Sequence, residues 1–362
     1  MHYAIALAYY GLVRVAQPGS TTELLVADGG DVARLDFARL VRRYARSFMH
    51  TDPQEALSYL YLIALNADLP APAGDAHLAA CHDAVRELVM DTRRYAELIG
   101  DVRADGTKVP GMLERDLKLI GLEHDAHSYL LNIVREAARR ADDADRFSEA
   151  LVLYNLAEDY DAVVGVLNAE LGAALSRPSL SAADDAGDDS AATSTMGLAS
   201  ASRENVVATA QNILAHYDRS MAVHGRVKRA TRETCETLLV LTSAVRAYER
   251  GLFARALDQV EQSKVVPLDG DLVAIVRAAE QVPELAEPVV RNLDVVLLAT
   301  MTSIYRLYNG ARDGSSGDSH TQARLLELRK KARALMTFAG MLKFRLTNDT
   351  HAALARLDVY IS

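Results

Sequence analysis

The stretch LDVVLLATMTSIYRLY, residues 293–308, has the apolar spacing of an α-helix. Its apolar positions recur every three or four residues and fill about four turns of one helix face. These positions are Leu293, Val296, Leu297, Thr300, Met301, Ile304, Tyr305 and Tyr308. The stretch VRELVMDTRRYAELI, residues 85–99, repeats the spacing, and the chain contains no convincing run of alternating apolar and polar residues. The sequence therefore predicts an all-α fold.

Residues that start and end helices agree with this periodicity. Asp52, Pro53 and Glu55 indicate an N-cap, a proline at the first helical position and a glutamate that reaches back to the cap. Gly100 follows Ile99 where a helix-ending glycine is expected. About fourteen helices are expected, mostly antiparallel neighbours joined by short loops. The expected spans are 2–16, 34–49, 53–67, 75–99, 111–119, 124–141, 146–157, 160–175, 202–223, 228–249, 252–262, 269–280, 284–309 and 320–346, with a short tail helix to the end.

The helix pairs repeat irregularly along the chain. The segments PQEALSYLYLIAL (53–65) and FSEALVLYNLAEDYDAVV (147–164) share a small residue followed by leucines and an aromatic side chain. The period of about 34 residues that defines a tetratricopeptide array is absent. A helix hairpin buries only one face by itself, and stacking against neighbouring hairpins buries the rest. We therefore expect an elongated, irregular α-solenoid of stacked antiparallel helix pairs.

Two polar segments interrupt the helical pattern. Residues 177–201 are rich in Ser, Ala, Asp and Gly and hold nothing large to bury, so a disordered loop is expected there. Residues 310–319 form a shorter segment of the same type. The expected organisation is a first part of the solenoid at 1–176, the loop at 177–201 and the C-terminal part of the same solenoid at 202–362.

Composition excludes several classes of protein. Half of the 362 residues are hydrophobic, and 40 Lys+Arg against 49 Asp+Glu give a net charge of −9, which disfavours a protein that grips nucleic acid. The two cysteines, Cys81 and Cys235, are too few and too far apart for a disulfide framework, and we expect reduced thiols in the cytosol or nucleus. No stretch approaches the roughly 18 uninterrupted apolar residues of a membrane span, so a soluble chain is expected.

Histidines offer the only leads toward chemistry. Phosphate-binding glycine loops, GxSxG and HExxH are all absent. His124 and His127, with Glu123 and Asp125 alongside, could bind a metal, or could form the solvated first turn of a helix. His77 and His82 flank Cys81 without sharing one clean helix face, which favours surface histidines around a packed cysteine. We expect no enzyme activity, no cofactor and no bound metal.

Aromatic and methionine side chains gather near the C-terminus. Such a set could line an apolar groove for a partner's short linear motif, or could be ordinary core between the last helices. The residues that we single out as candidates for partner binding are Tyr305, Tyr308, Phe338, Met341 and Phe344.

Six segments, in order along almost the whole chain, carry a resemblance to a known family. They are LVRRYARSFMHTDPQEALSYLYLIAL (40–65), CHDAVRELVMDTRRYAELIGDVRADGTKVPGMLER (81–115), EALVLYNLAEDYDAVVGVLN (149–168), KVVPLDG (264–270), LDVVLLATM (293–301) and KARALMTFAGMLKFR (331–345). The chain resembles the C-terminal half of the nucleoporin-interacting-component family, the scaffold nucleoporins of the inner ring of the nuclear pore.

The resemblance implies a structural scaffold at the nuclear envelope that supports pore assembly and nucleocytoplasmic transport of protein and mRNA. It implies binding of short linear motifs from other nucleoporins, especially the small membrane-apposed linker nucleoporin, and no direct binding of nucleic acid. The N-terminal region that binds the channel trimer in the family is expected to be absent from this chain. An α-solenoid adaptor of a vesicle-coat or tethering complex is the alternative, because the physics of the fold is shared.

Overall fold

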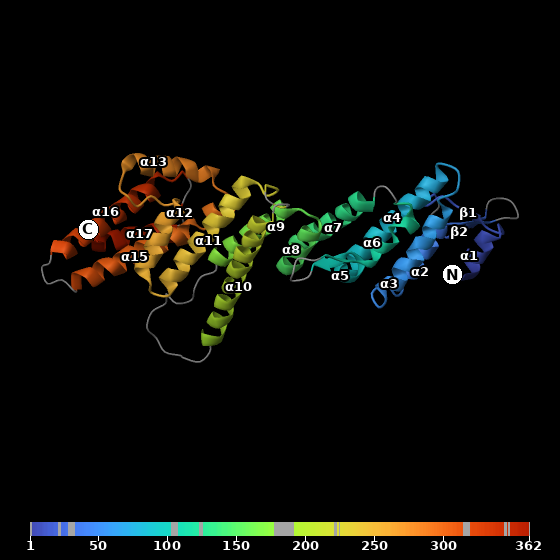
Figure 1. Ribbon diagram of the computed structural model, residues 1–362, viewed down its shortest axis with the longest axis horizontal. Helices are drawn as coiled ribbons and strands as arrows, with labels where there is room; N and C mark the ends of the chain where they lie inside the picture. The colour runs from blue at the N-terminus through green and yellow to red at the C-terminus, as the bar shows by residue number, and fades with distance from the viewer. Residues whose placement is uncertain are drawn as a thin grey trace. The chain divides into compact units, whose positions relative to one another are not determined.

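A computed structural model describes most of the chain, and Figure 1 shows its ribbon. The described residues are 2–20, 23–27, 33–102, 108–122, 126–176, 192–220, 223, 225–313, 319–343, 346 and 348–361. They form two compact units, Met1–Asp159 and Tyr160–Ser362. The expectation that the whole chain is elongated concerns the arrangement of these units and stays a prediction.

The first unit is a stack of helices in which chain neighbours pack together (Figure 1). Helix α2 packs on α3, α3 on α4, α4 on α7 and α7 on α8. The α-helices are α1 (His2–Tyr9), α2 (Phe37–Ala45), α3 (Pro53–Tyr61), α4 (Ala73–Thr92), α5 (Tyr95–Leu98), α6 (Met112–Asp116), α7 (Ala126–Asp142) and α8 (Phe147–Leu156), with the 3-10 helices η1 (Leu62–Asn66) and η2 (Leu117–Ile120). This pairing of successive helices is the arrangement that the sequence predicts.

The predicted start of α3 is confirmed. The Asp52 side chain accepts a hydrogen bond of 2.9 Å from the Glu55 amide, and Pro53 occupies the first helical position. An N-cap carboxylate satisfies an amide that has no partner within the helix. The helix then buries Ala56 and Leu57, both with no exposed surface, against the helices that follow.

Short strands occur where the sequence predicts helix or loop. Strand β3 (Ala33–Leu35) pairs in parallel with β1 (Arg14–Val15) and antiparallel with β2 (Leu25–Ala27). The predicted helix 2–16 stops at Tyr9 because the chain turns at Gly11, where φ is +69°. All of these strands have two or three residues, so the all-α class is confirmed.

The predicted helix 75–99 is also broken. Helix α4 ends at Thr92 because Arg93 adopts a left-handed conformation, with φ 56°. After the single turn of α5, the chain enters a hairpin of β4 (Gly100–Val102) and β5 (Lys108–Pro110). A Cβ atom on Gly100 would lie 2.4 Å from the Val109 carbonyl oxygen, so this crossing requires glycine.

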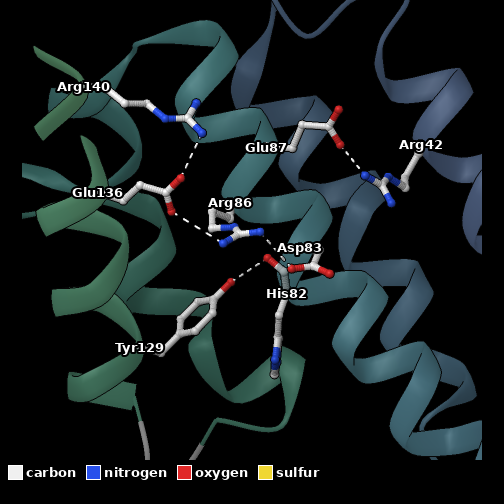
Figure 2. Close-up of polar contacts among 8 residues, drawn as sticks. All are labelled: Arg42, His82, Asp83, Arg86, Glu87, Tyr129, Glu136 and Arg140. Carbon is white, nitrogen blue, oxygen red and sulfur yellow. Dashed lines mark hydrogen bonds and ion pairs between the residues drawn. The ribbon is translucent and has the colours of Figure 1, made fainter. Parts of the chain in front are cut away.

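A series of polar contacts fixes α2, α4 and α7 to one another (Figure 2). Glu87 of α4 accepts a hydrogen bond from Arg42 of α2. It accepts another from Arg46, the residue that follows α2. Arg86, the residue before Glu87, lies 3.5 Å from Glu136 of α7, which also binds Arg140 at 2.9 Å. Tyr129 of α7 donates a 2.9 Å hydrogen bond to the backbone carbonyl of His82. Polar as well as apolar contacts therefore fix the register of these three helices.

The second unit contains the longer helices. They are α9 (Tyr160–Ser176), α10 (Ala192–Arg219), α11 (Arg229–Glu249), α12 (Phe253–Ser263), α13 (Leu272–Gln281), α14 (Glu287–Arg291), α15 (Leu293–Asp313), α16 (Ser319–Met341) and α17 (Asn348–Ile361), with η3 (Val282–Glu284). Helix α9 packs on α10, α11 and α14, α11 on α12, α12 on α15, and α15 on α16 and α17.

The segment predicted to be a disordered loop does not separate the two units. Residues 177–191 lie outside the described residues, whereas 192–201 form the first part of α10, which begins ten residues before the predicted start at 202. Helices α9 and α10, on either side of the segment, pack together within the second unit. The division between the units falls before α9, at Asp159.

Asn292 explains why the predicted helix 284–309 is broken into α14 and α15. Its side chain is fully buried and donates hydrogen bonds to the carbonyls of Gly172 (2.9 Å) and Pro288 (2.7 Å), while its oxygen accepts one from Ser176 (2.6 Å). A Cβ atom on Gly172 would lie 2.8 Å from Pro288, so α9 and α14 touch closely here. This contact joins helices more than a hundred residues apart in sequence.

Candidate functional site

Two of the predicted partner-binding residues belong to the core of the second unit. Phe338 of α16 has no exposed surface, and Tyr308 of α15 is 5 % exposed. The Tyr308 hydroxyl accepts a 2.7 Å hydrogen bond from Arg329, whose guanidinium also lies 5.4 Å from the ring centroid. Arg329 donates a second hydrogen bond, 3.0 Å long, to the carbonyl of Ile361 at the end of α17. Burial therefore leaves Phe338 no surface and Tyr308 very little surface to offer a partner.

The remaining predicted residues have other surroundings. Tyr305 is half-buried, and its ring lies 5.9 Å from that of Tyr360, which is itself exposed on α17. Met341, the last residue of α16, is 39 % exposed. Phe344 lies outside the described residues. The structure thus leaves Tyr305 and Met341 as accessible members of the predicted set, and their role in binding stays a prediction.

Helix α16 also borders a groove, which lies between α16 and α13. Its volume is about 520 Å³. The lining residues are Gly270, Leu272, Ile275, Leu326, Arg329, Lys330, Arg333, Ala334 and Thr337. Leu272 and Leu326, which line the same groove, are 59 % and 71 % exposed. The groove therefore combines apolar surface with three basic side chains.

The start of α13 follows from its local sequence. Asp271 caps the helix by accepting a 3.1 Å hydrogen bond from the Val273 amide. Gly270 precedes it with φ +71°, and a Cβ atom there would lie 2.6 Å from the Lys330 side chain. Glycine thus lets the start of α13 approach α16 closely, and this approach forms one end of the groove.

An ion-pair cluster joins α16 to α12. Lys331 lies 2.7 Å from Glu261 of α12 and 3.2 Å from Glu327 of its own helix. Burial lowers the pKa of Lys331, but the hydrogen bonds to Glu261 and Glu327 outweigh this and leave the pKa raised. The lysine therefore stays charged at neutral pH, so that α12 and α16 remain fixed while the neighbouring basic residues line the groove.

The groove was not predicted from the sequence, although its signal is present. Leu326, Arg329, Lys330, Arg333 and Thr337 follow the three- and four-residue spacing of a single helix face. That face reads as an ordinary solvated surface, and only the exposed leucine within it departs from the pattern. Since α13 supplies the opposite wall, the groove depends on a tertiary contact that spacing alone does not specify.

The histidine and cysteine leads take structural roles or lie outside the described residues. Cys81 is fully buried, its thiol lies 3.4 Å from the Leu60 carbonyl, and burial raises its pKa to about 12. His82 contacts the Ile120 carbonyl at 3.0 Å. The expectation of a surface-facing His77 is wrong, because that side chain is fully buried.

His127 is exposed on α7, whereas His124 and the carboxylates beside it are not described. In the described part of the chain, no group of three or more His, Cys, Asp or Glu side chains is placed to hold a metal ion. Nor does any helix in this part combine the length and the apolar character needed to cross a membrane.

Comparisons with known proteins agree with the resemblance read from the sequence. A family model described as Nup93/Nic96 matches residues 1–353. Nucleoporin NIC96 of Chaetomium thermophilum is 33% identical over 374 residues, which cover 98% of this chain and 33% of that protein. Nuclear pore complex protein Nup93 of Danio rerio is 31% identical over 367 residues, 99% of this chain and 40% of the relative.

A solved structure gives the same result for the fold. The crystal structure of Chaetomium thermophilum Nic96 SOL superimposes with a TM-score of 0.77 at 32% identity, covering 98% of this chain and 51% of that one. The chain spans between a third and two fifths of the length of the two curated relatives described here. The family match runs through both units and nearly the full sequence. The chain therefore belongs to the Nup93/Nic96 family of nucleoporins.

Proposed function

We propose that this chain is a structural part of the nuclear pore complex scaffold at the nuclear envelope. The observation that carries the proposal is the family match over residues 1–353, together with relatives that are named as nuclear pore proteins and align over 98–99% of the chain. The helical stacking supports the same role, because stacked helix pairs present long surfaces on which other chains can assemble. No catalytic role is part of this proposal.

Within that scaffold, the groove between α13 and α16 holds a short linear motif of another nucleoporin. The small membrane-apposed linker nucleoporin is the partner that the family resemblance implies. Leu272 and Leu326 offer apolar surface for one or two anchoring side chains, and Arg329, Lys330 and Arg333 suit a segment with acidic residues beside those anchors. Affinity would come from these few anchors rather than from total buried area.

Localisation tests the scaffold role. A fluorescent fusion of the chain is expected at the nuclear rim in cells, coincident with another nucleoporin. The comparisons reported above give no support to a vesicle-coat or tethering adaptor, which would instead concentrate on cytoplasmic membranes. Accumulation on such membranes, with none at the rim, would contradict the scaffold proposal.

Isothermal titration tests the groove. The purified chain is titrated with a peptide from the solenoid-binding region of the linker nucleoporin, and saturable one-to-one binding is expected. Arg333→Glu is expected to weaken binding by about tenfold or more, since it exchanges attraction for repulsion at the groove. Arg324→Glu, an exposed change of the same charge on α16 outside the groove lining, is the matched control. Equal affinities for the two variants would exclude this groove as the binding site.

A further inference from the structure

Helix α2 and its C-cap residue carry a row of arginines on one face. Arg39, Arg42, Arg43 and Arg46 follow the spacing i, i+3, i+4 and i+7, so they project along a single stripe. From Arg39 to Arg46 the stripe rises by seven residue steps, or about 10 Å along a helix axis. Arg39, Arg43 and Arg46 are exposed, and Arg42 is half-buried. These four arginines concentrate positive charge in one place, whereas the chain as a whole has a net charge of −9.

The stripe forms one wall of a groove of about 540 Å³ in the first unit. Pro18 and Gly19, from the turn after β1, provide a second wall, and Ala80 of α4 closes the groove with a small side chain. The volume is sufficient for several amino-acid side chains. This groove lies in a different unit from the one between α13 and α16, and the contacts that form it are independent of that groove.

Carboxylates engage the arginines of the stripe unequally. Asp36 lines the groove, but its side chain is buried and accepts a 3.0 Å hydrogen bond from the Arg39 amide as the N-cap of α2. Glu87 binds Arg42 and Arg46 (Figure 2 shows the first of these contacts). For Arg43, no ion pair is found within the described residues. Among the described residues, Arg43 therefore keeps donors that no carboxylate engages, whereas Glu87 holds Arg42 and Arg46.

We propose that this α2 groove binds an acidic peptide segment of another protein. The guanidinium group presents paired N–H donors that match a carboxylate, so a row of arginines recognises closely spaced acidic side chains. A stripe of about 10 Å corresponds to roughly three residues of extended chain, which is the scale of a short motif. The net negative charge of the chain opposes approach to an extended polyanionic surface, so a short segment fits better than a membrane.

Glu87 is not among the residues that line the groove, but it affects the groove in two ways. Its carboxylate orients Arg42 and Arg46, and it also occupies N–H donors that an incoming carboxylate could use. Although burial raises the pKa of Glu87, the hydrogen bonds from both arginines lower it overall, so the carboxylate is ionised at neutral pH. Neutralising Glu87 therefore releases donors to the ligand and removes a repulsive charge, and tighter binding of an acidic peptide follows.

Fluorescence anisotropy with a labelled octapeptide of alternating glutamate and glycine tests the proposal at near-physiological salt. The whole chain is used throughout. The double variant Arg39→Gln/Arg43→Gln is expected to weaken binding by about tenfold or more, because two charge-assisted contacts are lost. The control is Arg115→Gln/Arg139→Gln, which removes two exposed arginines elsewhere in the same unit and should change affinity by less than about twofold.

A gain in affinity provides a second, independent readout. Glu87→Gln is expected to bind the octapeptide several-fold more tightly than Asp91→Asn, which removes the same charge from an exposed position on α4. Equal losses in the two double variants would overturn the proposal, because they would indicate attraction to net charge alone. It would also be overturned if phosphatidylcholine vesicles containing phosphatidylserine bound through Arg39 and Arg43 while the octapeptide did not bind.

Discussion

Phe338 and Leu326 share helix α16 but have opposite surroundings, and replacing each with alanine separates stability from binding. Phe338 has no exposed surface, whereas Leu326 is 71 % exposed at the groove with α13. Phe338→Ala removes a buried ring and leaves a cavity, which destabilises proteins by about 3–5 kcal/mol. Leu326→Ala changes an exposed side chain, and we expect the free energy of unfolding to change by less than about 0.5 kcal/mol.

The two effects differ enough to be measured directly. For a unit of this size, each kcal/mol shifts the melting temperature by about 2–4 °C, so Phe338→Ala should lower it by roughly 6–20 °C. Circular dichroism at 222 nm, a wavelength that follows helix content, gives the melting temperature of each variant. Titration of the linker-nucleoporin peptide, well below the melting temperature, gives the affinity.

The two variants are expected to have opposite effects on stability and on peptide affinity. Phe338→Ala should lose stability but keep its peptide affinity, and Leu326→Ala should keep its stability but bind several-fold more weakly. An unchanged melting temperature for Phe338→Ala would refute the assignment of this ring to the core. A large loss of stability in Leu326→Ala would show that this side chain supports the fold rather than a partner.

Three further predictions concern stability. Asn292→Leu should lower the free energy of unfolding by about 2–4 kcal/mol in a denaturant titration, because it removes three hydrogen bonds, including the one that joins the end of α14 to the Gly172 carbonyl of α9. Asp52→Ala should cost about 1 kcal/mol by the same measurement, and Asp52→Asn, which keeps a capping oxygen, should recover most of it. Burial lowers the pKa of His77, opposed by Asp36 and the Ala16 backbone, so the unfolded chain binds the proton more readily and stability should fall as pH drops below about 6.5. In His77→Met, the free energy of unfolding should fall less over that range. Identical pH profiles for the two proteins would show that His77 is not the group whose protonation lowers stability.

The sequence predicted the elements that depend on local signals. The period of residues 293–308 is realised in α15, and the N-cap at Asp52 begins α3 as expected. The capping and periodic signals succeed here because they lie within one helix. The breaks at Arg93 and Asn292 were missed, since each depends on what the chain meets in space.

The site was harder to predict for the same reason. Phe338 and Tyr308 have the spacing of an apolar helix face, and that spacing is identical whether the face meets a partner or the neighbouring helices. For Tyr308, the contacts with Arg329 and between α15 and α17 show that this face packs against neighbouring helices. The two grooves instead use polar helix faces, whose significance appears only when a second element is placed opposite them.

The burial of both cysteines makes the chain convenient for spectroscopy. Cys81 and Cys235 are the only cysteines, both are fully buried, and burial raises the pKa of each thiol to about 12. Maleimide dyes react with the thiolate, so the native chain should stay almost unlabelled at neutral pH. A cysteine introduced at Arg43 or at Leu326 would then carry the sole dye, and the emission of that dye would report occupancy of one chosen groove.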